Sequence, residues 1–320
     1  FSYINLYIGD NLHTMTTFDL AIAWNWEYDK DFISGIEHEC AVRGITTYRI
    51  DPANLNITLE KLKTGEITFR GYYDRASDAD LAFLPLVEWM EGNAQLLINP
   101  YRLVLHAIDK ATMHMELMSN GLNVPNTIIL PPYNQSNSIT LDPIALDKLK
   151  KPFVIKPANT TGGGTGVILN ASTIQDILKA RQENKDDKYL VQETIYPKLL
   201  DGKRGWFRVY FAFEEIIPCW WDNITHDYTQ LQIEEEKNFN LSKLRDIMKI
   251  IQNICKLDFF SSEIALSENS DFVVVDYVNE VCDMRLKSIH HNGAPDEVVH
   301  KIEQLLAEFV KKQLNSTEHQ

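Results

Sequence analysis

A lysine and a glycine-rich segment lie next to each other near the middle of the sequence. Lys156 lies in the apolar run 153–157, and residues 160–166 comprise four glycines and three threonines. A lysine at the end of a buried strand can hold its charge against a phosphate group. Glycines let backbone N–H groups approach phosphate oxygens without interference from a side chain. The segment therefore predicts a phosphate-binding loop, and the alternative is a flexible surface hairpin. The expected contacts are Lys156, Thr161, Gly162, Gly163, Gly164 and Thr165.

The order of these residues excludes two familiar phosphate-binding motifs. The lysine precedes the glycines, whereas in a Walker loop it follows them. Val167 stands where the dinucleotide-binding fingerprint needs its third glycine. The strand-like run 167–169 follows the loop, so we predict a hairpin instead of a strand, loop and helix.

Oxygen-bearing side chains gather in two strand-like runs near the C-terminus. Glu263 lies in the run 259–266, and Asp276 and Asn279 lie in or just after the run 271–278. A polar turn separates the runs, so antiparallel pairing would bring the carboxylates together. Such ligands suit Mg²⁺, which also binds water and phosphate oxygens. The alternative is a solvated acidic face, but Asp276 follows three valines, and a buried carboxylate needs a partner.

The surrounding periodicity predicts the elements that would position these residues. In the first 100 residues a short apolar run (19–24), a helical pattern (31–43) and a β-branched run (45–50) follow one another. This order predicts a small doubly wound α/β lobe. Farther along we expect helices at 109–120, 174–181, 241–255 and 296–314. We also expect strands at 127–130, 189–193, 207–213 and 215–221.

Composition restricts the class of protein. The chain has 320 residues, 44% of them hydrophobic, and a net charge of -14, which argues against a general nucleic-acid binder. No apolar run approaches the ~20 residues of a membrane-spanning helix, so no membrane partner is expected. The four cysteines form no metal-binding pair and predict reduced thiols in the cytoplasm. The chain begins at Phe1, which leaves open whether a leader precedes it.

Taken in order, these motifs resemble the ATP-grasp superfamily. The order is a helix with a lysine, a strand that ends in Lys-Pro with a glycine loop, a hinge-like strand at 190–193, and then Glu and Asp-x-x-Asn. The resemblance covers roughly residues 100–315. It implies mixed α/β and α+β architecture, with two lobes that sandwich ATP behind a small doubly wound N-terminal domain. The expected boundaries are 1–105, 106–194 and 195–320.

The resemblance also implies a role for each matching residue. Lys110 and Lys156 would bind the ATP phosphates. Gln192 and Glu193 would belong to the hinge that meets adenine through backbone groups. The Mg²⁺ ligands would be Glu263, Asp276 and Asn279.

Three positions depart from the family pattern. The family usually ends in Glu-x-Asn, whereas this chain has Asp276-Tyr-Val-Asn279, which predicts either a β-bulge or a role shared with Glu280. Ser261 stands where many of these ligases carry an arginine. Arg285 follows the ligands at a place where some relatives keep small residues and glycines. Arg285 and Arg208 are the candidates for catalytic contact with an acyl phosphate or a substrate carboxylate, and a surface ion pair is the alternative for each.

The resemblance implies an ATP- and Mg²⁺-dependent ligase. It would convert a small-molecule carboxylate into an acyl phosphate and join it to an amine, such as an amino acid or a peptide-like substrate, or to a thiol. One alternative is a kinase of the same fold that phosphorylates a hydroxyl. Another is an ATP-binding module with weakened catalysis. Neither the substrates nor the oligomeric state follow from the sequence.

Overall fold

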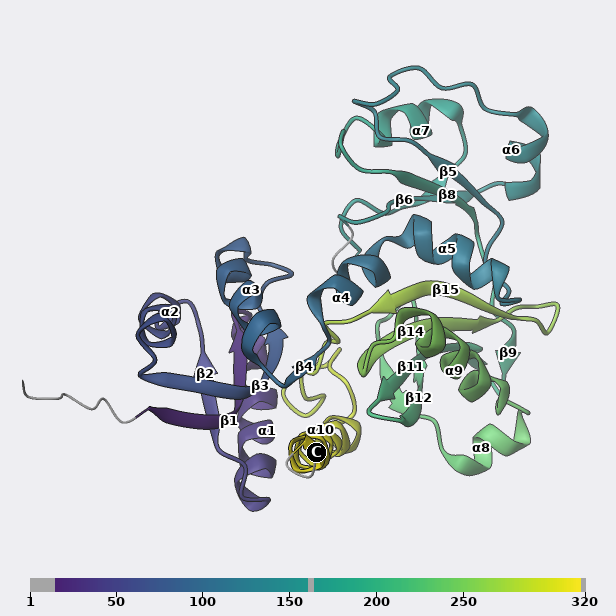
Figure 1. Ribbon diagram of the computed structural model, residues 1–320. Helices are drawn as coiled ribbons and strands as arrows, with labels where there is room; N and C mark the ends of the chain where they lie inside the picture. The colour runs from purple at the N-terminus through teal and green to yellow at the C-terminus, as the bar shows by residue number, and fades with distance from the viewer. Residues whose placement is uncertain (1–14, 161–163, 318–320) are drawn as a thin grey trace, which may run out of the picture. The chain divides into compact units, whose positions relative to one another are not determined.

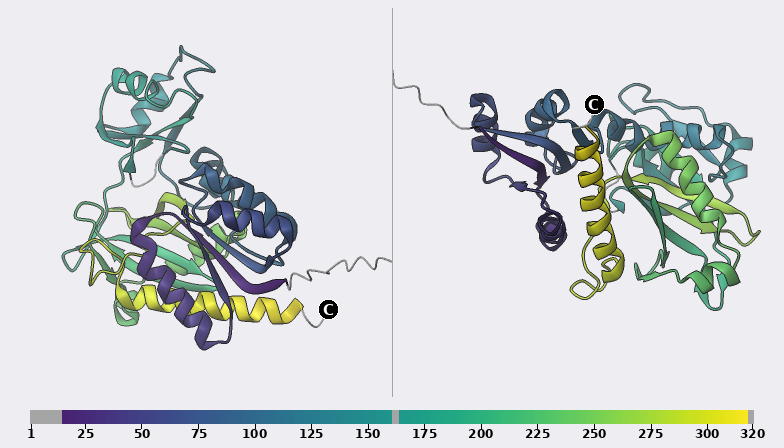
Figure 2. Two further views of the ribbon diagram at one scale, coloured as in Figure 1. Left: turned by 90° about the vertical axis from the view of Figure 1, so that its left-hand side faces the viewer. Right: turned by 60° about the horizontal axis from the view of Figure 1, so that its bottom comes forward.

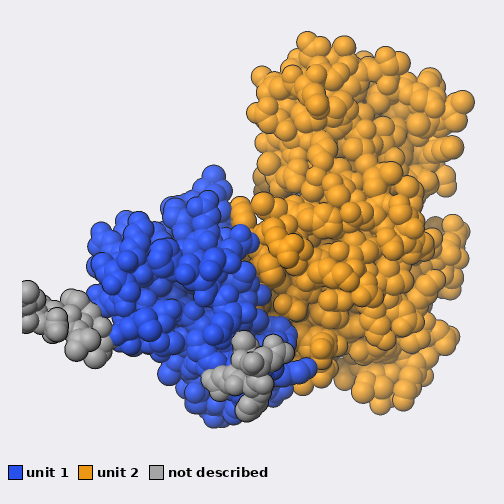
Figure 3. All heavy atoms as spheres, viewed as in Figure 1, with its two compact units in different colours: residues 1–27, 36–97, 307–320 blue, residues 28–35, 98–306 orange. Residues whose placement is uncertain are grey.

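The structure is a computed structural model that describes residues 15–160 and 164–317 (Figure 1). The predicted loop residues Thr161, Gly162 and Gly163 lie outside the described residues. The chain divides into two compact units (Figure 3). One comprises the described residues up to 27, residues 36–97 and the residues from 307, and the other comprises 28–35 and 98–306. The C-terminal end of the last helix is therefore grouped with the N-terminal unit.

The first unit contains the predicted doubly wound sheet. Its strands are β1 (Thr16–Trp24), β2 (Thr47–Ile50), β3 (Ile67–Arg75) and β4 (Leu96–Ile98), in the order β2-β1-β3-β4. β1 pairs in parallel with both β2 and β3. Its run Leu20–Ala23 is fully buried, as expected for a parallel strand covered on both faces. The helices between the strands are α1 (Lys30–Val42), α2 (Leu55–Thr64) and α3 (Leu84–Asn93).

A four-stranded antiparallel sheet forms the smaller lobe of the second unit. Its strands are β5 (Thr127–Leu130), β6 (Phe153–Pro157), β7 (Ile168–Ala171) and β8 (Tyr189–Glu193), in the order β5-β8-β6-β7. Helices α6 (Pro143–Leu149) and α7 (Ile174–Ala180) cover one face. Leu149 and Ile177 from these helices share a core with Ile155 and Val191 of the sheet. Side chains on the opposite face, Lys156 among them, are left to form a site.

A five-stranded antiparallel sheet forms the larger lobe. Its strands are β11 (Trp206–Ala212), β12 (Glu215–Trp221), β13 (Tyr228–Gln230), β14 (Phe259–Leu266) and β15 (Phe272–Asn279), in the order β13-β12-β11-β14-β15. Figure 2 shows α9 (Lys243–Cys255) against one face of this sheet. Phe207 and Ile264 share a core with Leu244 and Met248 of that helix. Because side chains alternate along a strand, Arg208 and Glu263 belong to the other face.

Two short helices precede the smaller lobe and position a lysine. These are α4 (Tyr101–Ile108) and α5 (Lys110–Ser119). The Asp109 carboxylate caps α5 by accepting hydrogen bonds from the backbone N–H groups of Ala111 (3.0 Å) and Thr112 (3.2 Å). Lys188 from the segment before β8 pairs with the same carboxylate at 2.5 Å. The cap therefore places Lys110 in the first turn of the helix.

The remaining helices complete the fold. They are α8 (Ile233–Asn238) and α10 (Asp296–Thr317), and a short hairpin pairs β9 (Leu199–Leu200) with β10 (Lys203–Arg204). None of the helices in the described residues is both long and apolar enough to cross a membrane. All four cysteines, Cys40, Cys219, Cys255 and Cys282, are buried, and none of them forms a disulfide. Burial raises the pKa of the Cys40 and Cys255 thiols to about 12 in each case.

Candidate active site

Two lysines from different elements approach one carboxylate. Lys156 at the end of β6 is 7% exposed, and its Nζ donates a hydrogen bond to the backbone oxygen of Val275 at 3.1 Å. The Nζ of Lys110 in α5 lies 3.5 Å from Asp276 Oδ1. Burial lowers the pKa of Lys156 to about 8, with Asp276 opposing and the charge of Lys110 adding to the effect. These lysines carry more positive charge than this spot can neutralise, so they are suited to an anion.

The two predicted metal carboxylates face each other across neighbouring strands. Glu263 of β14 pairs directly with Asp276 of β15 in the register of the sheet. Glu263 forms an ion pair with Arg208 of β11 and accepts a hydrogen bond from Trp206 Nε1 at 3.1 Å. Burial alone would raise the pKa of Asp276, but the charges of the two lysines and of Arg208 lower it below its usual value. Asp276 is thus held in its ionised form, and Glu263 is already paired with a cation.

A β-bulge brings the third predicted ligand onto the same face. Ser261 pairs with Asn279, and Glu263 pairs with Asp276, so two steps along β14 correspond to three along β15. The register confirms the bulge that the Asp-x-x-Asn spacing predicted. Directly opposed residues point to the same face of a sheet. Asn279 therefore shares a face with Glu263 and Asp276, despite the extra residue.

This oxygen-rich set fits a magnesium ion better than a softer metal. No group of three or more His, Cys, Asp or Glu side chains that could hold a metal is found in residues 15–160 and 164–317. The two carboxylates and the Asn279 amide supply oxygen alone, and they leave positions for water and phosphate oxygens. Magnesium prefers this kind of incomplete site. The ligand roles of Glu263, Asp276 and Asn279 stay predictions.

The two candidate arginines have different partners in the structure. Arg208 lies opposite Glu263 in the sheet register, with its guanidinium 4.9 Å from the centre of the Trp221 ring. Its Nε and the Oγ of Ser261 are buried without hydrogen-bond partners in the described part of the chain. Arg285, in the loop after β15, forms a two-pronged ion pair with Asp283 at 2.6 to 3.1 Å. Arg208 thus has a donor free beside the carboxylates, whereas the guanidinium of Arg285 is engaged within its own loop.

The predicted adenine hinge is tied to the edge strand of the smaller sheet. The Gln192 amide donates to Thr127 Oγ1 (2.9 Å) and to the Tyr277 hydroxyl (2.8 Å). The backbone N–H of Glu193 donates to the carbonyl of Asn126 at 3.0 Å. That donor is therefore occupied, and a bound adenine would have to use backbone groups that follow Glu193. The hinge role of both residues stays a prediction. The hydrogen-bond partners of Gln192 and Glu193 could not be identified from the sequence.

The start of the glycine loop is anchored by a residue that sequence reasoning missed. The buried carboxylate of Asp187 accepts hydrogen bonds from Asn159 and Thr160, including one from the Thr160 hydroxyl at 3.0 Å. Farther on, Gly164 is exposed with a φ of +82°, which favours glycine. Thr165 is exposed next to it. The loop therefore starts from a fixed point, although nothing around Asp187 in the sequence indicates it.

Sequence reasoning also missed the aromatic support of Arg208. In the register of β11 and β12, Cys219 lies opposite Arg208 and Trp220 lies opposite Phe207. Trp220 therefore belongs to the core face, and the adjacent Trp221 belongs to the site face. The strand alternation would have separated the two tryptophans, but only the pairing register shows which one meets the arginine.

Of the comparisons with known proteins, the one with solved structures found similar proteins. No protein-family profile and no curated protein matches the sequence. Among solved structures, D-cycloserine synthetase DcsG is 14% identical with a TM-score of 0.64, over 91% of this chain and 99% of that one. The D-alanine–D-alanine ligase from Bacillus anthracis, complexed with ATP, is 14% identical with a TM-score of 0.61, over 95% and 99%. The chain has the ATP-grasp fold.

A third ATP-grasp structure of similar size is also alike. The ATP-grasp ligase PsnB, complexed with the precursor peptide PsnA2 and AMPPNP, is 14% identical with a TM-score of 0.59, over 93% of this chain and 98% of that one. At these identities the likeness establishes the fold. The expected architecture is thus confirmed, and any function of the chain depends on the residues of the site.

Proposed function

We propose that this chain is an ATP- and Mg²⁺-dependent ligase that activates a carboxylate as an acyl phosphate and joins it to an amine. The observation that supports this proposal most is a cluster of positively and negatively charged side chains within the second compact unit. Lys110, Lys156 and Arg208 surround the oxygen ligands Glu263 and Asp276. Three cations beside two carboxylates leave an excess of positive charge, which favours binding of a polyphosphate together with a metal ion.

Each group in the site has a role in binding ATP. Lys110 and Lys156 would hold the phosphates, and the glycine loop after β6 would close over them. Glu263, Asp276 and Asn279 would hold Mg²⁺, which neutralises phosphate charge when bound. The backbone after Glu193 would meet the adenine.

The reaction has two displacement steps. A substrate carboxylate oxygen attacks the γ-phosphorus, the bond to the β-phosphate oxygen breaks, and ADP leaves. The amine nitrogen then attacks the carbonyl carbon of the acyl phosphate, loses a proton to solvent, and expels inorganic phosphate. The Nε–H group of Arg208, which is buried without a partner in the described residues, would stabilise negative charge on the oxygens of the acyl group. Positioning and charge neutralisation carry such a reaction, so no protein nucleophile is needed.

The names of the similar structures suggest which substrates to test. The macrocyclase MdnC, bound with the precursor peptide MdnA, is 13% identical with a TM-score of 0.61, over 93% of this chain and 100% of that one. PsnB was likewise solved with a precursor peptide, whereas DcsG is named for a small-molecule product. We therefore propose amino acids and peptides as the substrates to test first.

The decisive experiment traps the acyl phosphate. The protein is incubated with ATP, Mg²⁺ and pooled carboxylates, with hydroxylamine as the nucleophile, and ADP, phosphate and hydroxamate are measured. A ligase forms all three in equal amounts, and only when the carboxylate is present. ADP with a phosphorylated hydroxyl compound and no free phosphate would identify the kinase alternative. Nucleotide binding without any turnover would identify the binding module.

A further inference from the structure

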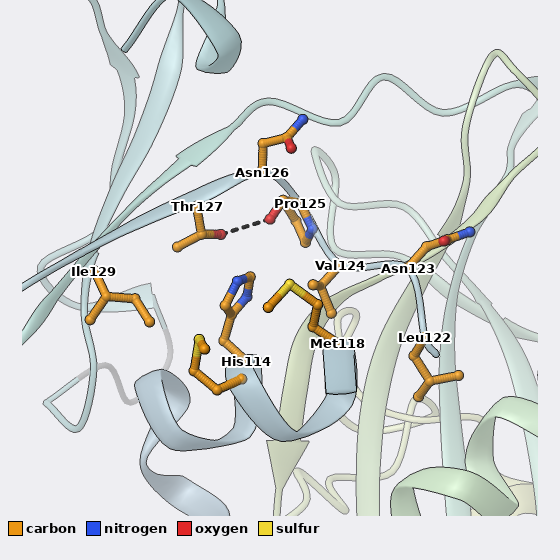
Figure 4. Close-up of a pocket in the computed structure, with 10 residues that line it drawn as sticks. His114, Met118, Leu122, Asn123, Val124, Pro125, Asn126, Thr127 and Ile129 are labelled. Atoms are coloured by element: carbon orange, nitrogen blue, oxygen red, sulfur yellow. Dashed lines mark hydrogen bonds between the residues drawn. The ribbon is translucent and has the colours of Figure 1, made fainter. Parts of the chain in front are cut away.

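A cavity of about 490 Å³ opens beside α5, outside the proposed nucleotide and metal site (Figure 4). Its walls come from α5, from the segment 122–126 and from the start of β5. The volume lies within the range of small-molecule sites. Its lining includes His114, Met115, Met118, Val124, Thr127 and Ile129. None of the residues proposed to bind ATP or Mg²⁺ belongs to the lining.

A chain of buried hydrogen bonds determines which nitrogen of His114 carries its hydrogen. Thr127 Oγ1 donates to the carbonyl oxygen of Pro125 at 2.7 Å, because a carbonyl can only accept. The Gln192 amide nitrogen must then be the donor to Thr127, and it also donates to the Tyr277 hydroxyl at 2.8 Å. The hydroxyl proton of Tyr277 is left for His114 Nδ1, at 2.7 Å. His114 is therefore protonated on Nε2.

That Nε2–H group is a donor without a partner. Nδ1 faces Tyr277, and in residues 15–160 and 164–317 no hydrogen bond to Nε2 is found. Figure 4 shows the imidazole rising from α5 toward Thr127 and Pro125, at the wall of the cavity. Burial, together with the charge of Lys156, lowers the pKa of His114 to about 4, so the ring is neutral near pH 7. The cavity thus offers the neutral Nε2–H group of His114 in a wall that combines apolar side chains with the uncharged polar side chains of Asn123, Asn126 and Thr127.

We propose that this cavity binds a small uncharged molecule with an apolar body and a carbonyl oxygen that accepts a hydrogen bond from His114 Nε2. The lining holds no Lys, Arg, Asp or Glu, so a charged ligand would be desolvated without a partner. Met115 and Met118 are each 48% exposed, and their flexible thioethers can adapt to an apolar group.

Binding of a ligand in this cavity should also change the affinity of the nucleotide site. This expectation rests on the proposed function. Tyr277, which fixes His114, lies next to Asp276 in β15, and its ring centre is 5.2 Å from Lys156 Nζ. Helix α5 carries both His114 and Lys110, one turn apart. Ligand and nucleotide should therefore change each other's affinity by the same factor.

The first test uses benzamide as a probe, with toluene and benzoate as matched controls. The full chain is labelled with ¹³C at its seven methionine methyl groups. We expect benzamide to shift the Met115 and Met118 signals with saturation, and to leave Met90 and Met248 unchanged. Benzamide should bind about 2- to 10-fold more tightly than toluene, because it gains one hydrogen bond. Equal binding of the two probes, or shifts that never saturate, would overturn the proposal.

Two variants locate the effect. His114→Phe keeps a ring and removes the donor, so benzamide should lose its advantage while toluene still binds. Met118→Trp fills the cavity and leaves the Tyr277 network untouched, so it should abolish binding of both probes even if His114→Phe fails to fold. Benzamide that still shifts the Met115 signal of Met118→Trp would place the binding site elsewhere.

The second test measures coupling by calorimetry with AMPPNP. Saturating benzamide should change the affinity for AMPPNP by about 5-fold or more, and Met118→Trp should remove that change. An unchanged affinity would refute the coupling through Tyr277. Failure of AMPPNP to bind at all would count against the proposed function. The methionine signals would still show whether the cavity binds benzamide.

Discussion

Lys156 illustrates how a single buried charge points to a ligand. Its amine is nearly inaccessible, receives one backbone oxygen as a hydrogen-bond acceptor, and shares its surroundings with a second lysine. Burying a cation disfavours folding unless another charge compensates it. Asp276 is close enough to help, but Lys110 already binds it at 3.5 Å. The residual positive charge is what a phosphate group would neutralise.

We therefore expect Lys156→Met to weaken AMPPNP binding by about 10- to 100-fold, the loss of one charged hydrogen bond. The thermal stability should stay equal or rise, because an apolar side chain of similar length removes a buried charge. Titration calorimetry and a melting curve measure the two effects. Lys249→Met, at a side chain that is 65% exposed, is the control. Unchanged affinity in the Lys156 variant would remove this residue from the site.

Asp276→Asn tests the metal assignment. The variant keeps the shape of the side chain and loses its charge, so the Mg²⁺ concentration for half-maximal activity should rise at least about 10-fold. Asp271→Asn, at an exposed position in the turn before β15, should leave it unchanged. Equal magnesium dependence in both variants would show that the ion is bound elsewhere.

At this scale the sequence predicted the residues better than their partners. Lys156, Glu263 and Asp276 could be found because each stands in an apolar strand, where a charge is conspicuous. The pairing of Arg208 with Glu263, and its packing on Trp221, depends on the register between separate strands. Local patterns do not carry that register. Asp187 was missed for the same reason, since its partners lie 27 and 28 residues away.

The elements of the fold follow their local signals closely. β6, β8 and β14 have the predicted bounds, because apolar and β-branched runs end at clear polar or proline residues. The helix expected at 109–120 is α5, which begins after its Asp109 cap. The bulge in β15 could be proposed from spacing alone, but only the pairing showed that it keeps Asn279 on the site face.

Two glycines in or after helices should respond in opposite ways to alanine. Gly92 lies within α3, and an added Cβ would meet nothing within 4 Å, so Gly92→Ala should stabilise the protein by about 0.5 to 1 kcal/mol. Gly121 follows α5 with a φ of +81°, so Gly121→Ala should destabilise it by about 1 kcal/mol. Urea unfolding measures both. Gly121→Asn should lose less than the alanine variant, because asparagine tolerates a positive φ.

On the scale of the whole molecule, the family resemblance implied an N-terminal domain and two lobes, but not how the chain is divided between the two compact units. The last helix begins in one unit and ends in the other, which no periodicity within α10 indicates. The division depends on contacts between distant parts of the chain. It therefore had to come from the structure.

Ionisation of the Asp258 carboxyl group should weaken folding. Burial, with the nearby charge of Glu214, raises the pKa of Asp258 from 3.8 to about 6. The folded state thus favours the protonated acid, and its contribution to stability is lost as the pH rises from about 4 through 6. Asp258→Asn should then raise the free energy of unfolding by about 1 to 3 kcal/mol at pH 7.

The same substitution should have little effect at pH 4, where Asp258 is protonated in the folded state. Urea unfolding of the variant and the parent protein at both pH values measures the difference. Asp246→Asn, on the exposed side of α9, is the control. An equal change at the two pH values would contradict the assignment to a titrating group.

The burial of all four thiols has a practical consequence for testing the proposed closure of the glycine loop. A maleimide dye needs an accessible thiolate, and none of the native cysteines offers one in the folded protein. A cysteine introduced at Thr165, on the exposed side of the loop, would therefore take up the fluorophore alone. A change in its fluorescence on addition of ATP would support the proposed closure, and the rest of the chain would stay native.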